Sequence, residues 1–285
     1  MLAYRHAFHA GNHADVLKHL VLVAVLDHLA AKDKGYRIVD THAGAGGYSL
    51  EGRYAQKKHE FDSGIGRLWP RDDLPPPVAR YVELVRRFNG GATTLAQYPG
   101  SPALAQMLLR PQDQLRLYEL HPTDHKILAS FLGEQPGVEV RMADGFAALK
   151  SQLPPPTRRG VVLVDPPYES KADYARALAA LREALTRFAD AVVIVWLPQL
   201  QLLESRQLPQ RLKAGAEALA KKGWLLARLT VADADARGFG LLGSSVFVAN
   251  PPHTLHAELK SVLPWLAQAL AQTQQQYALE RSAVA

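Results

Sequence analysis

The sequence predicts an α/β protein built on a mostly parallel sheet of seven strands. Seven short apolar runs, rich in β-branched residues, are bounded by Gly or Pro, and helical patterns lie between most of them. Parallel neighbours need such crossover connections, whereas a short loop is enough for antiparallel neighbours. The expected strands cover residues 36–40, 115–119, 138–142, 161–165, 191–196, 224–231 and 244–249.

The segments around these strands support the assignment in chain order. Before the first strand, Asn12 is a candidate N-cap for a long helix over residues 14–32. Residues 173–189 repeat apolar side chains at steps of three and four, which predicts an amphipathic crossover helix. The last two strands are joined without a helical pattern, so they should form an antiparallel pair. The Gln- and Ala-rich C-terminus is expected to be frayed.

One connection is too long for a single crossover helix. The first strand ends at Asp40 and the second at Glu119, 119 − 40 = 79 positions later, whereas a βαβ unit takes about 30 residues. Residues 62–69 and 77–88 have helical patterns. We therefore predict a main domain with an N-terminal helix, residues 1–52 and 93–285, and a basic helical insertion, residues 53–92. A polyanionic substrate is an expected partner of its basic residues, which are Arg53, Lys57, Lys58, Arg67, Arg71, Arg80, Arg86 and Arg87.

Composition narrows the class of protein. The 285 residues carry a formal net charge of +6, with a pI near 9.5, which favours a nucleic-acid or polyphosphate partner without proving one. Cysteine is absent, which excludes disulfides and thiolate nucleophiles and agrees with a reducing compartment. The N-terminus lacks the apolar core of a signal peptide, and the apolar run at 20–26 is too short to span a bilayer. We expect a monomeric cytoplasmic protein with no membrane partner.

The segments that follow the first four strands carry the candidate binding residues. The loop DTHAGAGGY at 40–48 contains Gly44 and Gly46, and small residues there let the backbone turn sharply and approach a ligand. Glu119 ends the second strand, where a carboxylate can accept hydrogen bonds from ribose hydroxyls. Asp144 and Gly145 follow the third strand, placed to accept from an exocyclic amine or to cap a helix. The glycine spacing differs from the dinucleotide fingerprint and argues against hydride transfer.

The fourth strand runs into Asp165-Pro166-Pro167-Tyr168. Two consecutive prolines forbid both strand and helix and hold the backbone rigid. Such a loop could simply be a stiff connection, but it follows three other strand ends that carry glycines and carboxylates. Because parallel strands end at one edge of a sheet, these four segments are expected to meet there.

In this arrangement the sequence resembles the S-adenosylmethionine-dependent methyltransferases with a Rossmann-like, class I fold. The D-P-P-Y motif is similar to that of enzymes that methylate the N6 amine of adenine. YRHAFHAGNHADVLKH at 4–19, DTHAGAG, YPGSP, ELHP, ADGF and RRGVVLVDPPYE together resemble the bacterial 23S ribosomal RNA large subunit methyltransferase J family. The resemblance covers nearly the whole chain and thins out in the insertion and after about Leu270.

The resemblance implies an activity and a set of site residues. It implies transfer of a methyl group from S-adenosylmethionine to the N6 amine of an adenine in 23S ribosomal RNA. Free RNA or early assembly intermediates are the expected substrate, because a base packed inside an assembled particle costs more to extrude. Tyr4 is expected to contact the RNA, with His6 and Lys18 beside it. Asp165, Pro166 and Tyr168 are the expected catalytic residues. The residues expected to bind the methyl donor are His19, His42, Gly44, Gly46, Ser101, Glu119, Asp144, Gly145 and Asp165.

The D-P-P-Y order suits this chemistry. The lone pair of an adenine amine is delocalised into the ring, so the amine is a poor nucleophile. Asp165 can accept one N6 hydrogen and the Pro166 carbonyl the other, which aims the lone pair at the donor methyl group through orientation and electrostatics alone. Tyr168 offers an aromatic face for an extruded base. No metal is expected.

Two other motifs are better explained by structure than by chemistry. His6, His9, His13 and His19 lack the H-E-x-x-H spacing or Cys partners of a zinc site. Loop or helix-cap roles are sufficient to explain His6, His9 and His13. Asn250-Pro251-Pro252-His253 imitates an N-P-P-Y motif. It follows the last strand instead of the fourth and ends in His, so we interpret it as a rigid strand terminus.

Three alternative functions remain open on the sequence alone. A DNA adenine-N6 methyltransferase shares the chemistry but should add a domain that reads sequence. A protein-glutamine methyltransferase usually has Asn at the first position of the D-P-P-Y motif. A non-enzymatic RNA-binding protein has no use for converging carboxylates, which repel phosphate.

Overall fold

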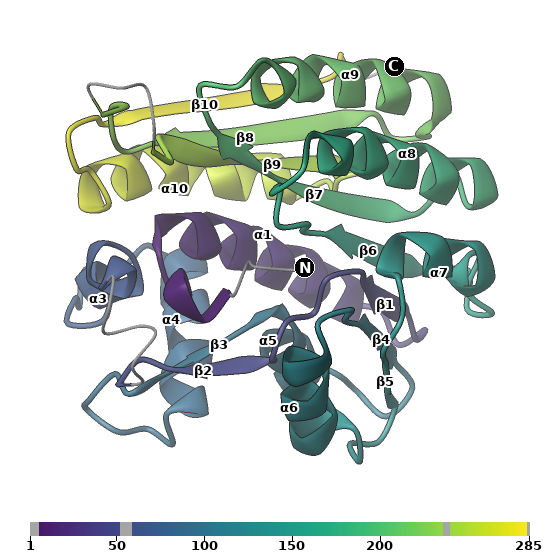
Figure 1. Ribbon diagram of the computed structural model, residues 1–285, viewed down its shortest axis with the longest axis horizontal. Coiled ribbons are helices and arrows are strands. Elements are labelled where there is room, and N and C mark those ends of the chain that lie inside the picture. Colours follow the sequence, from purple (N-terminus) through teal and green to yellow (C-terminus); the bar gives the residue numbers. More distant parts are fainter. Residues whose placement is uncertain (1–5, 52–58, 236–239, 284–285) are drawn as a thin grey trace.

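The computed structural model describes residues 6–51, 59–235 and 240–283. Two sheets and the helices around them make up the fold (Figure 1). The helices are η1 (His6–Phe8), α1 (His13–Ala30), η2 (Glu60–Ser63), α3 (Ile65–Leu68), α4 (Pro76–Phe88), α5 (Ser101–Met107), α6 (Pro122–Leu132), α7 (Gly145–Gln152), α8 (Lys171–Arg187), α9 (Leu203–Leu219) and α10 (Leu255–Ala269). The strands are β1 (Arg37–Asp40), β2 (Gly47–Ser49), β3 (Gln97–Pro99), β4 (Gln114–Tyr118), β5 (Val138–Arg141), β6 (Gly160–Val164), β7 (Val192–Gln199), β8 (Trp224–Thr230), β9 (Gly243–Ala249) and β10 (Gln276–Arg281).

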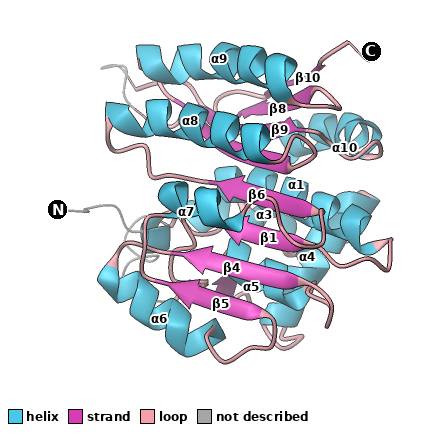
Figure 2. Ribbon diagram, turned by 90° about the vertical axis from the view of Figure 1, so that its right-hand side faces the viewer, coloured by secondary structure: helices cyan, strands magenta, loops and turns pink. Residues whose placement is uncertain are grey.

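The predicted fold class is confirmed. Within the described residues the main sheet has the order β10-β8-β9-β7-β6-β1-β4-β5. Strands β5, β4, β1, β6 and β7 run parallel, and Figure 2 shows the arrows of β6, β1, β4 and β5 pointing the same way. Strands β8 and β9 form the expected antiparallel pair, and β9 is also antiparallel to β7.

The strand count and the C-terminus differ from expectation. The main sheet has eight strands instead of seven, because β10 pairs antiparallel with β8 at the sheet edge. The C-terminus is therefore not frayed over Gln276–Arg281. The segment QYALER is polar and partly exposed, since an edge strand with one open side does not need a continuous apolar run. Strands β2 and β3 form a separate two-stranded sheet that the sequence did not predict.

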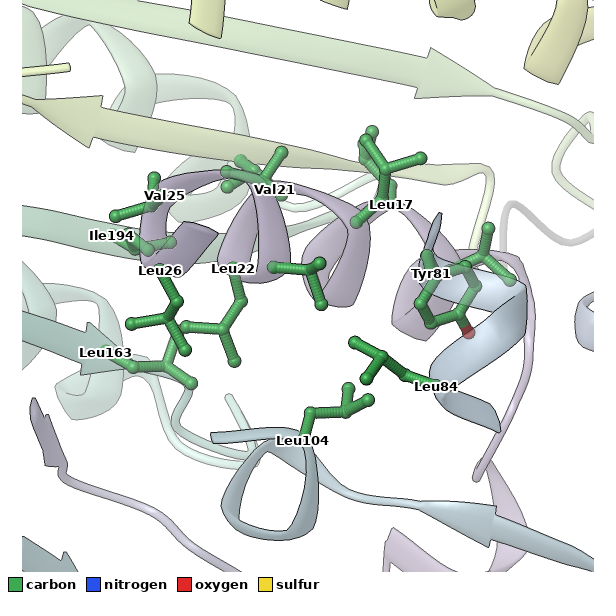
Figure 3. Close-up of a cluster of buried hydrophobic side chains, with 14 of the residues drawn as sticks. Leu17, Val21, Leu22, Val25, Leu26, Tyr81, Leu84, Leu104, Leu163 and Ile194 are labelled. Carbon is green, nitrogen blue, oxygen red and sulfur yellow. The ribbon is translucent and has the colours of Figure 1, made fainter. Parts of the chain in front are cut away.

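The core lies in two layers, one on each face of the main sheet. Successive strand residues point to opposite faces, so Ile38 joins the cluster under α1, α4, α5 and α10, whereas Val39 joins the cluster under α7, α8 and α9. Helix α1 is buried around most of its circumference and begins at the predicted N-cap, where the Asn12 side chain accepts from the backbone N–H groups of Ala14 and Asp15. In Figure 3, α1 lies between α4, α5 and the sheet.

The predicted insertion is represented by η2, α3 and α4, which lie between β2 and β3 in the chain. Arg53, Lys57 and Lys58 lie outside the described residues. Helix α4 packs on α1, and its Arg80 forms a bidentate ion pair with Asp27 at 3.0 and 3.2 Å. Arg71 pairs with Asp73, and Arg86 donates to the Trp69 carbonyl. The division into residues 53–92 and the rest of the chain stays a prediction.

Candidate active site

Three neighbouring strands end in matched register at one edge of the main sheet. Asp40, the last residue of β1, pairs with Leu117 of β4 and with Leu163 of β6. Glu119 and Asp165 each follow two residues further along their chains. Both carboxylates therefore lie just beyond the same edge, as the sequence predicted from the strand ends.

A cavity of ≈ 220 Å³ opens at this edge, and we call it the main cleft. It is lined by the loop after β1, the segment after β4, the D-P-P segment after β6 and part of α1. The predicted site residues that line it are Lys18, His19, His42, Gly44, Ser101, Glu119, Asp165 and Pro166.

The glycine loop and Glu119 are held together by backbone hydrogen bonds. One Glu119 oxygen accepts from the Gly44 N–H at 2.8 Å, and the other accepts from the His121 N–H at 2.6 Å. Burial raises the pKa of Glu119, while these two bonds oppose the shift. Gly44 has φ +60°, and a Cβ there would lie 2.3 Å from the Tyr48 hydroxyl. The loop thus requires glycine at this position.

Three of the residues predicted to bind the methyl donor lie beside the main cleft and do not line it. Asp144 caps α7 by accepting from the backbone N–H groups of Phe146 and Ala147, and it pairs with Arg176, which does line the cleft. A Cβ on Gly145 would lie 2.0 Å from the Thr41 carbonyl. Gly46 accepts a hydrogen bond from the Gly100 N–H at 2.9 Å. Their positions shape the cleft through its loops.

Asp165 is held by a buried ammonium group. Lys18 Nζ lies 2.5 Å from Asp165 Oδ2 and 2.8 Å from Asp15 Oδ1, and its side chain is 4% exposed. Burial alone would lower the pKa of Lys18, but the charges and hydrogen bonds of the two carboxylates outweigh it and raise that pKa above its ordinary value. The sequence placed Lys18 beside the RNA, and the structure places it between these two carboxylates.

A second cavity of ≈ 160 Å³, which we call the side cavity, adjoins the main cleft. Lys18, Asp165 and Pro167 line both cavities. Tyr168 and Trp196 line only the side cavity, with ring centroids 5.8 Å apart. The Tyr168 hydroxyl donates to the Trp196 carbonyl at 2.7 Å, so the ring is fixed at its far end. Tyr168 has φ +52°, a strained conformation for a bulky residue.

The predicted histidines are fixed by neighbours on the cleft wall. His19 Nδ1 lies 2.7 Å from the Tyr98 hydroxyl, which lies 2.8 Å from the Tyr81 hydroxyl. His42 Nδ1 lies 2.8 Å from the Thr41 hydroxyl, and burial lowers the pKa of His42 to about 3. His42 is therefore neutral at physiological pH. Tyr4 and the side chain of His6 lie outside the described part of the chain.

Asp40 is a buried carboxylate under the main cleft. It accepts from the Ser101 hydroxyl at 2.6 Å and from the His42 N–H at 3.2 Å, and it is 2% exposed. Burial raises the pKa of Asp40 to about 6, with the charge of Asp165 adding to the shift and the two hydrogen bonds opposing it. This carboxyl therefore titrates within two units of neutral pH.

The raised pKa predicts that Asp40 lowers the free energy of unfolding as pH rises. The folded state holds the proton more tightly than the unfolded state, so stability that is present below about pH 4 is lost as pH rises through about 6. A shift of about two units corresponds to about 3 kcal/mol. Relative to Asp40→Asn, which cannot ionise, the wild-type free energy of unfolding should fall by up to about that amount between pH 4 and 7. Urea unfolding measures it.

The control for this prediction is Asp33→Asn, which removes an exposed carboxylate. The difference between wild type and the Asp33 variant should stay nearly constant over the same pH range. An equally constant difference for Asp40→Asn would show that Asp40 does not titrate there.

The sequence missed several residues of the site. Asp15 could have been found from the sequence only by a weak pattern: it lies three residues before Lys18 on α1, a spacing that permits an i,i+3 ion pair. Trp196 gave no signal, and Tyr98 was noted only as part of YPGSP, without a role of its own. The roles of both depend on strands and helices that are distant in the chain. Within the described residues no cluster of three or more His, Asp or Glu side chains could hold a metal ion, and no helix has both the length and the apolarity to cross a membrane.

The sheet order and the cleft at the carboxyl ends of its parallel strands define a class I, Rossmann-like methyltransferase that depends on S-adenosylmethionine. The family model described as "Ribosomal RNA large subunit methyltransferase D, RlmJ" matches residues 33–282. The chain belongs to this family.

Individual relatives agree with this assignment. The chain is 44% identical to the ribosomal RNA large subunit methyltransferase J of Haemophilus influenzae, over 95% of this chain and 94% of that protein. It is also 44% identical to the protein of the same name from Escherichia coli, over 93% of each. A crystal structure of a Legionella pneumophila protein superposes with a TM-score of 0.87 at 32% identity, covering 96% of this chain and 99% of that one.

Proposed function

We propose that this chain transfers a methyl group from S-adenosylmethionine to the N6 amine of an adenine in 23S ribosomal RNA, with free RNA or early assembly intermediates as the substrate. We infer that it acts as a cytoplasmic monomer. The observation that carries the chemistry is the position of Asp165 on the wall shared by the main cleft and the side cavity. One cavity can then hold the methyl donor and the other the target base.

The residues of the main cleft fit the methyl donor. Each carboxylate oxygen of Glu119 accepts one hydrogen bond from a backbone N–H group. The second lone pair of each oxygen remains available to the ribose hydroxyls. The glycine loop brings backbone close to the ligand, and at Gly44 a Cβ would collide with Tyr48. His42 is neutral, half-buried and edge to face with Phe146, and it offers an uncharged surface to an adenine ring. When bound, the donor supplies an electrophilic methyl group attached to a sulfonium.

Asp165 and Pro166 are proposed to orient the amine. The carboxylate accepts one N6 hydrogen and the Pro166 carbonyl accepts the other, so the nitrogen lone pair points across the shared wall toward the main cleft. Two prolines keep the accepting carbonyl in place. Lys18 fixes the carboxylate from behind at 2.5 Å and, with Asp15, limits its rotation. This arrangement works by orientation, and it demands no covalent intermediate.

The side cavity is proposed to hold the extruded adenine. Its aromatic wall comes from Tyr168 and Trp196, and base–aromatic stacking is worth about 1–3 kcal/mol. That amount offsets much of the few kcal/mol needed to unstack a base. We propose that Tyr4 and His6 complete the RNA contact. Gly46, Asp144 and Gly145 support donor binding by shaping the loops around the cleft.

Loss of Glu119 is expected to weaken donor binding. Glu119→Ala removes the proposed ribose acceptor and the anchor of the Gly44 loop, which should cost about 1.5–3 kcal/mol, or roughly 10- to 150-fold in the dissociation constant. Calorimetric titration with S-adenosylmethionine measures this change. The control is Asp124→Ala, another carboxylate of the same cleft, which should change the affinity much less. Unaltered affinity in a folded Glu119 variant would remove this residue from the donor site.

Two substitutions of Tyr168 separate its ring from its hydroxyl. Tyr168→Phe keeps the aromatic face and loses one hydrogen bond to the Trp196 carbonyl, so it should retain most of the methylation rate. Tyr168→Ala removes the stacking face and should lose roughly 10- to 100-fold, the equivalent of about 1–3 kcal/mol. Single-turnover rates on RNA test both, with the free energy of unfolding measured in parallel. Equal loss in the two variants would show that the ring is not a stacking surface.

The function itself is tested with RNA from a strain that lacks this gene. Purified protein and labelled S-adenosylmethionine are incubated with extracted 23S RNA, with assembled large subunits and with duplex DNA, and the product nucleoside is mapped. We expect N6-methyladenosine in free 23S RNA at a rate that falls with salt. Preference for assembled subunits would contradict the proposed substrate state. Methylation of DNA in place of RNA would contradict the function.

A further inference from the structure

The described part of the chain has another hollow at the edge of the main sheet opposite the main cleft. It lies where β9 and β10 end and β8 begins, and its volume is ≈ 650 Å³. Because β9 is antiparallel to β7, and β7 is parallel to β6, this is the edge at which the parallel strands begin. Strands of about seven residues separate the two edges by about 23 Å. The hollow, which we call the Pro251 hollow, is therefore distinct from the active site.

The walls of the Pro251 hollow are fixed by the Asn-Pro-Pro-His motif. Asn250 is 3% exposed and has φ +51°. Its side-chain amide donates to the carbonyls of Ala189 and Ala191 at 2.8 and 2.7 Å, and its oxygen accepts from the Lys222 N–H at 2.8 Å. One asparagine thus ties the start of β7 to the turn before β8. Pro251 and Pro252 then form a stiff wall of the hollow.

The hollow combines an apolar floor with a cationic rim. Pro251 and Pro252 supply apolar surface, together with the small exposed part of Trp224, which is 7% exposed and has Phe247 stacked on its ring. The Trp224 indole N–H donates to Glu217, which also lines the hollow, at 3.1 Å. The side chains of Lys222 and Arg281 are exposed on the rim, with no ion-pair partner among the described residues. By contrast, Arg71 and Arg80 of the insertion are already paired with acidic side chains.

Histidines also line the Pro251 hollow. His28 and His253 meet edge to face with ring centroids 4.9 Å apart, and His256 also lines the hollow. Burial lowers the pKa of His28, and the nearby His253 and Lys222 add to this shift. Burial also lowers the pKa of His256, with Arg281 and Lys260 adding to it. Both shifts include a contribution from neighbouring positive charge, which a bound anion would offset.

We propose that the Pro251 hollow is a second binding site for a nucleotide, whose base packs against Pro251, Pro252 and the exposed part of Trp224 while its phosphate contacts Lys222 and Arg281. A phosphate would pair with the cations of the rim, and a base would contact the apolar floor. An inorganic anion alone would make no use of that floor. The nucleotide is supplied either by a segment of an RNA substrate remote from the methylated adenine or as a free mononucleotide. Binding of the nucleotide does not depend on the proposed target of methylation, whereas the RNA source rests on the proposed function.

Binding of a mononucleotide tests the site directly. GMP is the probe, with saturating S-adenosylhomocysteine present to block the main cleft. We expect the wild type to bind GMP and Lys222→Glu and Arg281→Glu each to bind it at least 10-fold more weakly at low salt. Both side chains are exposed, so the variants should fold. The matched control is Lys150→Glu, an exposed lysine on α7, which should change GMP affinity less than twofold.

A second arm distinguishes the two sources of the nucleotide. Methylation is compared on full-length 23S RNA and on a short fragment that contains only the methylated adenine and its flanking nucleotides. If the hollow holds remote RNA, Lys222→Glu lowers kcat/KM at least 10-fold on the long RNA and leaves the fragment unchanged. If it holds a free nucleotide, both substrates are methylated at wild-type rates while GMP binding is lost. No GMP binding by the wild type, or equal weakening in Lys150→Glu, would overturn the proposal.

Discussion

Asp165→Ala is expected to lower single-turnover methylation by at least 100-fold while RNA affinity stays within about threefold. The carboxylate is proposed to act on the amine that becomes the nucleophile, so its contribution belongs to the transition state more than to the bound substrate. Losing one preorganised polar group of this kind typically costs about 10²–10³ in rate. The fold should tolerate the change, because Lys18 keeps Asp15 as a partner at 2.8 Å.

Rapid-quench methylation at saturating enzyme, with RNA binding measured separately, tests this expectation. The matched control is Glu169→Gln, which removes a negative charge from the main cleft four residues further along the same loop. That variant should keep a rate within a fewfold of wild type. A near wild-type rate for Asp165→Ala, or an equal loss in the Glu169 variant, would contradict the proposed role.

Lys18→Met is expected to lower the free energy of unfolding by about 3–5 kcal/mol, a large share of the stability of an ordinary protein. The substitution keeps the length of the side chain but leaves Asp15 and Asp165 without their shared counter-charge. Asp15 is 2% exposed, so water cannot replace the ammonium group. Removing one partner of a buried ion pair is costly in a way that replacing the whole pair is not.

A double-variant cycle separates the charge effect from lost packing. Adding Asp15→Asn to Lys18→Met removes one of the two carboxylate charges that faced the lysine, and it should restore part of the lost stability. Urea unfolding of the four proteins gives the coupling energy between the two positions. A double variant no more stable than Lys18→Met alone would mean that the lysine acts through packing and not through its charge.

Most of the main sheet could be predicted from the sequence, because its buried strands are runs of β-branched and other apolar residues. Strand β10 was missed because an edge strand can remain polar, and β2 and β3 were missed because three residues each are too few for a pattern. Glu119 and Asp165 could be found because residues that follow parallel strands lie at one edge of the sheet, whatever the packing of the rest of the chain.

The remaining parts of the site depend on contacts between distant segments. Lys18 and Asp165 are 147 positions apart, and no local pattern shows that α1 crosses the end of β6. The same holds for the hydroxyl of Tyr168 on the backbone of Trp196 and for the Pro251 hollow, whose walls come from four separate segments. The Asn-Pro-Pro-His motif was recognised as rigid, but the cavity beside it could not be inferred.

The nearly complete burial of α1 has a consequence for synthesis on the ribosome. The helix is apolar around most of its circumference and packs on β9, yet β9 begins 243 − 30 = 213 residues after the helix ends. At roughly 5–20 residues per second, about 10–40 s pass between the two. During that interval the apolar helix α1 has been synthesised but the strand on which it packs has not. Nascent chains arrested before residue 243 should therefore be bound by chaperones or aggregate, whereas chains released after β10 should not.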